Sequence, residues 1–130
     1  MADTVDTKVL RNATGHYTVV LQNRSDGTGE SDVTKVDIST LLNAAGQTAT
    51  YTTIERIDWA VWGFNYVLLE WDHTTDDEIA TLAGVGSLDW TYEGGNVDPR
   101  SSGGTGDILL TTSGTTANSG YDITIRLRLK

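Results

Sequence analysis

The sequence predicts an all-β domain, an antiparallel β-sandwich or jelly roll, with one short α-helix. Short runs rich in β-branched and aromatic residues recur along the chain, and several alternate apolar with polar side chains. Turn sequences rich in glycine, asparagine and serine separate these runs, as in antiparallel rather than parallel sheets. A length of 130 residues suits one domain that spans 1–130.

The C-terminal run, YDITIRLRLK (121–130), is the clearest predicted strand. Its strict alternation predicts one face in the core and one in solvent. The expected core face holds Ile123, Ile125, Leu127 and Leu129. The expected outer face holds Thr124, Arg126, Arg128 and Lys130. Because an unpaired terminal strand would invite aggregation, we expect it to be paired within a sheet.

Weaker runs predict the other strands, at 7–12, 16–23, 31–39, 52–62, 64–71, 87–92 and 107–112. In 16–23, Tyr17, Val19 and Leu21 share one face, and the nearly continuous apolar run 64–71 is typical of a central strand. Turn clusters lie at 25–30, 43–47, 93–106 and 113–120. In the first, SDGTGE, the Asp-Gly pair predicts a hairpin.

The segment DHTTDDEIATLAG (72–84) predicts the helix, at 76–83. Thr75 and Glu78 have the spacing of a capping box, and acidic residues favour the first turn of a helix. Apolar residues at helical spacing follow, and Gly84 fits a helix end. The apolar stripe would comprise Ile79, Leu82 and Ala83.

The same segment raises the question of a metal site at Asp72, His73 and Asp76 or Asp77. Zinc sites usually bring several histidine or cysteine ligands, and this chain has two histidines and no cysteine. The alternating oxygen-bearing side chains of 26–32 suggest calcium, but the downstream glutamate of an EF-hand loop is missing. They are Asp26, Thr28, Glu30 and Asp32. We therefore predict no metal.

Charge is distributed unevenly around a net value of -9. Between Glu55 and Asp98 ten acidic residues accompany one base, Arg56, whereas the rest of the chain has eight of each. Net negative charge argues against non-specific nucleic-acid binding. The asymmetry suggests one face in solvent and another against a partner. The candidate cations for that interface are Lys8, Arg11, Arg100, Arg126, Arg128 and Lys130.

The four tryptophans admit two interpretations. In the first, Trp59 and Trp71 fill the core while Trp62 or Trp90 covers an edge or interface. In the second, they form a sugar-stacking platform as in carbohydrate-binding modules. Because Trp59 and Trp62 are three residues apart, they face opposite sides of a regular strand and cannot share one flat platform. Core plus interface is favoured, with Trp62 and Trp90 as the interface candidates.

Nothing in the sequence predicts catalysis or a cofactor. A G-x-S-x-G motif is missing, there is no cysteine, and neither His16 nor His73 lies in a context that marks a general base. No apolar run approaches the roughly 20 residues that a membrane span needs. The N-terminal MADTVDTKVLRN lacks the apolar core of a secretory signal, so synthesis in the cytosol is expected.

Several stretches together resemble a known group of proteins. They are MADTVDTKVLRN, HYTVVLQNRSDGTGE, WDHTTDDEI, VDPRSSGGTGDILLTT and YDITIRLRLK. In these the chain resembles small all-β structural proteins of marine tailed bacteriophages. The resemblance covers most of the chain and includes no catalytic or ligand-binding motif, so it assigns no role to any single residue.

The resemblance implies a structural virion protein, a decoration or cement protein on the outside of the head shell. The implied partners are the major capsid protein or other virion proteins, with self-association in the assembly and no nucleic acid or membrane. Two alternatives stay open, a neck or tail component of the same virion and, in a different class, a carbohydrate-binding module.

Overall fold

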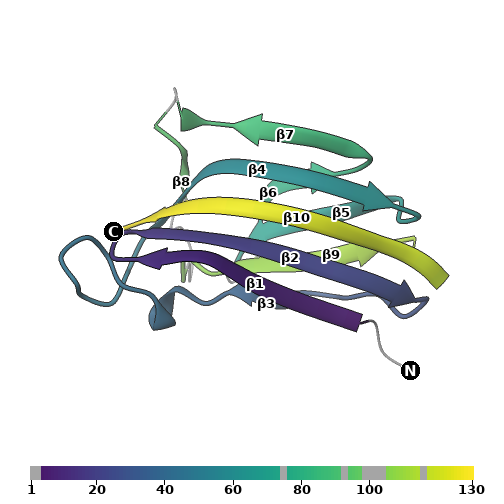
Figure 1. The fold of residues 1–130 in the computed structure, drawn as a ribbon, viewed down its shortest axis with the longest axis horizontal. Coiled ribbons are helices and arrows are strands. Elements are labelled where there is room, and N and C mark those ends of the chain that lie inside the picture. Colours follow the sequence, from purple (N-terminus) through teal and green to yellow (C-terminus); the bar gives the residue numbers. More distant parts are fainter. Residues whose placement is uncertain (1–3, 74–75, 92–93, 98–104, 115–116) are drawn as a thin grey trace.

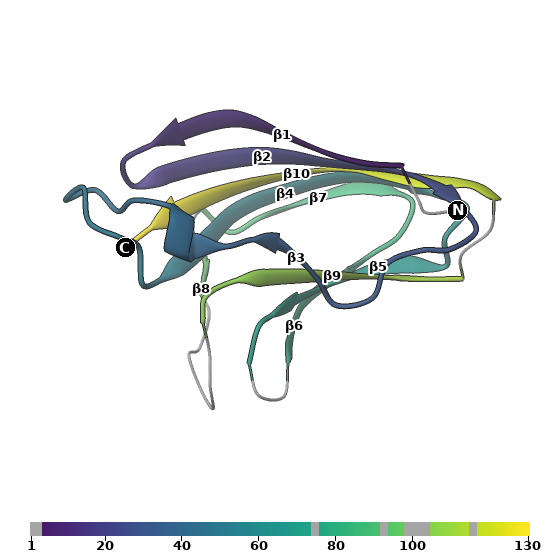
Figure 2. The same ribbon diagram turned by 90° about the horizontal axis from the view of Figure 1, so that it is seen from below.

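The protein is a sandwich of two antiparallel β-sheets, seen as two layers in Figure 2. The computed structural model describes residues 4–73, 76–91, 94–97, 105–114 and 117–130. Sheet A has the strand order β1-β2-β10-β4-β7, with β8 paired to β4, and sheet B has the order β3-β9-β5-β6 (Figure 1). The predicted all-β sandwich is confirmed.

Sheet A consists of β1 (Thr4–Ala13), β2 (His16–Asp26), β4 (Thr52–Trp62), β7 (Val85–Asp89), β8 (Asn96–Val97) and β10 (Ala117–Leu129). Sheet B consists of β3 (Val33–Val36), β5 (Tyr66–Trp71), β6 (Asp77–Leu82) and β9 (Ile108–Ser113). One 3₁₀ turn, η1 (Ile38–Thr40), is the only helical element in the described part of the chain.

Strand β10 is central in sheet A, paired with β2 on one side and β4 on the other. Its predicted core residues are buried, with exposures between 0% and 2% for Ile123, Ile125, Leu127 and Leu129. Tyr17, Val19 and Leu21 on β2 are buried as predicted. Strand β5 is central in sheet B, between β9 and β6, which also agrees with its apolar sequence.

Three of the tryptophans, Trp59, Trp71 and Trp90, contact the core. Trp71 is 2% exposed and fills the centre as predicted. Trp59 is half-buried at the margin, where its indole N–H donates to the carbonyl of Ala83 at 3.1 Å. A Cβ added to Gly86, which is opposite Trp59 on β7, would lie 2.7 Å from the indole. The close approach therefore requires glycine at that position.

The predicted helix at 76–83 is wrong, because Asp77–Leu82 forms strand β6. This strand pairs with β5, with Leu82 opposite Val67 and Ala80 opposite Leu69. Ala80 and Leu82 are buried while Ala83 is exposed, which is the period of a strand and not of the expected helical stripe. An isolated helix of this length is marginal, whereas the free edge of β5 supplies a full ladder of hydrogen bonds. Thr75, the expected cap, lies outside the described residues.

The predicted hairpin at 25–30 is also wrong, because β2 belongs to sheet A and β3 to sheet B. Asp26 does form the local turn, accepting hydrogen bonds from the backbone N–H and the hydroxyl of Thr28. The chain then crosses between the sheets, where the Glu30 carboxylate pairs with Lys35 and accepts from Asn23 and Tyr121. A buried carboxylate needs such partners, so this network fixes the crossing.

Candidate functional site

The outward surface of sheet A, called face A below, carries most of the protein's cations. Alternation along the paired strands places six of the nine lysines and arginines there. They are Lys8, Arg11, Arg24, Arg56, Arg126 and Arg128. Lys130 follows the end of β10 and is exposed. The predicted interface cations of the two terminal segments thus lie on or next to one surface.

The register aligns three of these cations in a row across four strands. Thr18 on β2 is opposite Arg11 on β1 and Arg126 on β10, and Arg126 is opposite Arg56 on β4. Adjacent strands are about 4.8 Å apart, so the row spans roughly 14 Å. A partner that presents several carboxylates at that scale could engage the whole row.

Only part of this positive charge is neutralised within face A. Arg56 pairs with Asp58 at 2.9 Å and with Asp89 at 3.2 Å, and the hydrogen bond and charge of Asp58 raise the pKa of Arg56. Arg126 lies 3.9 Å from Glu55, and the structure places no ion pair or hydrogen bond on Lys8 or Arg11 within its described residues.

Arg128 is held differently from Arg126. Its guanidinium donates to the carbonyl of Gly94 at 3.1 Å, and its Nε is buried. Arg128 therefore also ties β10 to the turn at 94–95. Within the sheet, Arg126 therefore makes a long contact with an acid, whereas Arg128 makes a contact with a backbone carbonyl.

The outward surface of sheet B, called face B, is acidic. Glu70 on β5 is directly opposite Glu78 on β6, and Asp32 and Asp76 lie beside them. Lys35, the one cation in the strands of sheet B, is buried with Glu30. Face A mixes its cations with acids such as Asp6, Asp58, Asp89 and Asp122, whereas face B is acidic, so charge is distributed unevenly between the two faces.

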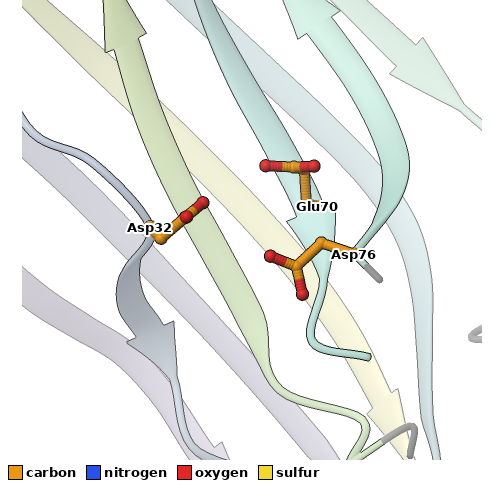
Figure 3. A group of neighbouring side chains, drawn as sticks. All are labelled: Asp32, Glu70 and Asp76. Atoms are coloured by element: carbon orange, nitrogen blue, oxygen red, sulfur yellow. The ribbon is translucent and has the colours of Figure 1, made fainter. Parts of the chain in front are cut away.

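Three carboxylates converge on face B, from Asp32, Glu70 and Asp76 (Figure 3). Their oxygens lie within 4.8 Å of one another. Burial is the main cause that raises the pKa of Glu70, and the charges of Asp32, Asp76 and Glu78 add to it. Oxygen ligands of this kind suit a hard cation such as Ca²⁺. Each aspartate also has a protein contact, from the Thr111 hydroxyl to Asp32 and from the His73 N–H to Asp76.

Among the described residues, the metal ligands considered from the sequence, Asp72, His73 and Asp76 or Asp77, do not converge on one point. His73 is buried with its Nδ1 3.8 Å from Asp77, and Asp72 accepts from the Thr105 hydroxyl at 3.0 Å. The tertiary structure instead joins Asp76 to Asp32 and Glu70, which are distant in sequence. That no metal is needed stays a prediction.

Face A has a hollow of about 420 Å³. It lies at one end of the strands, away from the row formed by Arg11, Arg126 and Arg56. Trp62 forms one wall, with an exposure of 44%, and its indole lies over Gly120. Arg24 is on the far side of Gly120, and the next row across the sheet is Asp6, Gln22 and Asp122. Asn23 and Tyr121 complete the lining.

Four of the polar side chains that line the hollow are available for a ligand. Within the described part of the chain, no hydrogen bond or ion pair engages the side chains of Asp6, Gln22, Arg24 or Asp122. The exposed indole can stack on a ligand. The neighbouring carboxylates, amide and guanidinium supply both hydrogen-bond acceptors and hydrogen-bond donors. Alternation could have placed Arg24 and Asp122 outward, but the sequence carried no signal for their register with Trp62.

The two remaining interface candidates lie elsewhere. Trp90 is half-buried against the core, where its backbone N–H donates to the carbonyl of Glu55 at 2.9 Å. It therefore does not share a surface with Trp62. Arg100 lies outside the described residues.

Compared with protein-family models, curated proteins and solved structures, the chain matches none of them. Among the described residues there is no helix long and apolar enough to cross a membrane. The functional argument therefore rests on the two faces of the sandwich and on the hollow beside Trp62.

Proposed function

We propose that this chain is a structural protein of a tailed-bacteriophage virion that decorates the outside of the head shell. In this arrangement face A docks on the shell and face B points to solvent. The observation that carries the proposal is the uneven charge of the two faces, with the cations concentrated on face A and an acidic face B. The sequence resemblance to phage structural proteins supplies the class of assembly.

Electrostatic complementarity explains how such docking would be specific. The protein as a whole is acidic, with a net charge of -9, so an acidic shell would repel it in most orientations. Face A alone presents cations without close partners, notably Lys8 and Arg11. A carboxylate-rich surface of the major capsid protein, or of another virion protein, would therefore select this face.

Binding to particles that lack this protein tests the proposal. Lys8→Gln with Arg11→Gln removes two cations that the described structure leaves without internal partners, so the fold should be unaffected. We expect the fraction that co-sediments with particles to decrease, with affinity lowered about tenfold, and wild-type binding to weaken with salt.

The matched control makes the same change in net charge on the opposite face. Thr34→Glu on β3 with Ser113→Glu on β9 adds two negative charges on face B, so the net charge changes by the same amount. This variant should bind like the wild type. Equal binding by all three proteins, insensitive to salt, would reject docking through face A.

The position of the chain in the virion separates decoration from a neck or tail role. A map of intact particles would show several copies on each capsomer for a decoration protein. A ring of fixed copy number on the portal axis would instead assign the neck or tail.

The hollow beside Trp62 supports a second candidate function, carbohydrate binding. Binding to a glycan array, lost in Trp62→Ala, would favour it. Tyr66→Ala is a suitable control, because Tyr66 is a similarly exposed aromatic residue, at 38%, on face B. Absence of glycan binding by the wild-type protein would remove this candidate and leave docking on the shell untouched.

A further inference from the structure

Strand β1 is the longest edge strand of the sandwich. It has 10 residues and lies at one edge of sheet A, whereas the other edge strands, β3, β7, β6 and β8, have 4, 5, 6 and 2 residues. One side of β1 pairs with β2, and within the described chain no strand pairs with its other side. Its outer backbone groups can therefore accept a further strand.

The side chains of β1 are exposed on both faces of the sheet. Val5 and Val9 are opposite the buried Asn23 and Val19 on β2, so they point toward the inner side of sheet A. They are nevertheless 43% and 50% exposed, which means that sheet B does not cover β1. A long, exposed edge strand with apolar side chains is open to pairing with another chain.

The sequence of β1 is self-complementary in one antiparallel register. If Thr7 is opposite Thr7 of a second copy, Val5 is opposite Val9 and Asp6 is opposite Lys8, each pair occurring twice. Apolar residues then meet on the inner side and opposite charges meet on face A. The bulge between Val9 and Arg11 ends the regular segment just beyond these pairs.

Neighbouring registers lack this complementarity. When the outer faces of both copies stay on the same side, the two nearest symmetric registers bring Asp6 opposite itself or Lys8 opposite itself. Like charges directly opposite each other are unfavourable. Charges on an edge strand often prevent strand pairing, but here Asp6 and Lys8 would block the shifted registers and favour the one centred on Thr7.

We propose that β1 pairs with β1 of a second copy of this chain, antiparallel and centred on Thr7. Sheet A then continues across two copies, and the Lys8 side chains of both lie near the two-fold axis, each opposite Asp6 of the other copy. The inference rests on the edge, exposure and sequence of β1, and it is independent of the proposed place in a virion.

Cysteine cross-linking of the purified protein tests the register, because the natural chain has no cysteine. Thr7→Cys should form an inter-chain disulfide on mild oxidation, since opposite residues of antiparallel strands are about 4.5–5.5 Å apart. Val5→Cys alone should not, because its copies would be roughly 13 Å apart along the strand. A mixture of Val5→Cys and Val9→Cys should cross-link.

Charge exchange provides a second measurement that needs no new covalent bond. Sedimentation over a concentration series should show a reversible dimer of the wild-type protein. Asp6→Lys or Lys8→Asp alone should raise its dissociation constant at least about tenfold, and the double exchange should restore it.

A monomer at all concentrations, or a Thr7→Cys protein that cross-links no faster than Val5→Cys alone, would overturn the proposal. So would preferential cross-linking of Asp6→Cys with itself, which would show a different register.

Discussion

The indole of Trp62 on β4 lies over Gly120, the residue opposite it on β10. A Cβ added to Gly120 would be 2.5 Å from a ring carbon of Trp62 and 2.5 Å from the carbonyl oxygen of Asn23. Glycine at this position therefore lets the indole lie flat on the sheet and form the wall of the hollow on face A.

Gly120→Ala should consequently destabilise the fold by about 1–3 kcal/mol, through overpacking against the ring and the backbone. Trp62→Ala should cost less, and the double variant should cost less than the sum because one of the two collisions disappears. Urea unfolding of the three variants measures this coupling. Additive losses would mean that the ring does not rest on Gly120 in solution.

Leu127→Ala should lower the free energy of unfolding by about 2–5 kcal/mol, because Leu127 is fully buried in the central strand of sheet A. Thr124→Ala on the outer face of the same strand is the control, and we expect a change within about 0.5 kcal/mol. Chemical denaturation checks both. A loss for Leu127→Ala below about half a kcal/mol would place β10 outside the core.

Glu70→Gln should raise the melting temperature at pH 7. Burial and neighbouring carboxylates raise the pKa of Glu70 above its ordinary value of 4.5, so the folded protein keeps this proton to a higher pH than the unfolded chain. The contribution of Glu70 to stability is complete below the ordinary pKa and decreases as the pH rises through the raised one. The advantage of the variant should therefore vanish below about pH 4. A variant that is less stable than the wild type at pH 7 would contradict this.

The protein should fold without a metal, so EDTA should leave the melting temperature unchanged. The converging carboxylates make calcium the sharpest challenge to this prediction. An increase of several degrees on adding Ca²⁺ that is lost in Glu70→Gln would show it to be wrong.

The double variant Arg126→Glu with Arg128→Glu tests whether the two arginines bind the shell or stabilise the fold. If face A docks on a shell, the folded variant should no longer bind particles. The contacts of Arg126 with Glu55 and of Arg128 with Gly94 predict some loss of stability as well. Thermal melts therefore have to accompany the sedimentation assay. A stable variant that still binds particles would place the contact away from this row.

Much of the strand inventory could be predicted because its physical signal is local. Alternation in 121–130 identified the buried face of β10, since successive side chains on a strand point to opposite sides. The same periodicity separated Trp59, at the margin of the core, from the exposed Trp62. These inferences needed only the geometry of one strand.

The arrangement of the strands depended on contacts between distant segments. Residues 77–82 have a pattern that is compatible with a helix. They form a strand because they pair with the otherwise free edge of β5. The turn after β2 forms locally as expected, yet only the packing of two sheets sends the next strand into sheet B.

The candidate sites show the same division. The sequence by itself determined that Arg126 lies on an outward position and that excess acid lies in the central third. The bulge between Val9 and Arg11, which the sequence did not reveal, places Arg11 on the same face as Lys8. Only the tertiary structure aligned Arg11 with Arg126, set Trp62 beside Arg24, and joined Asp32 to Glu70. The reason is physical, because strand register and sheet packing are set by burial and hydrogen bonding over the whole chain, which no single segment encodes.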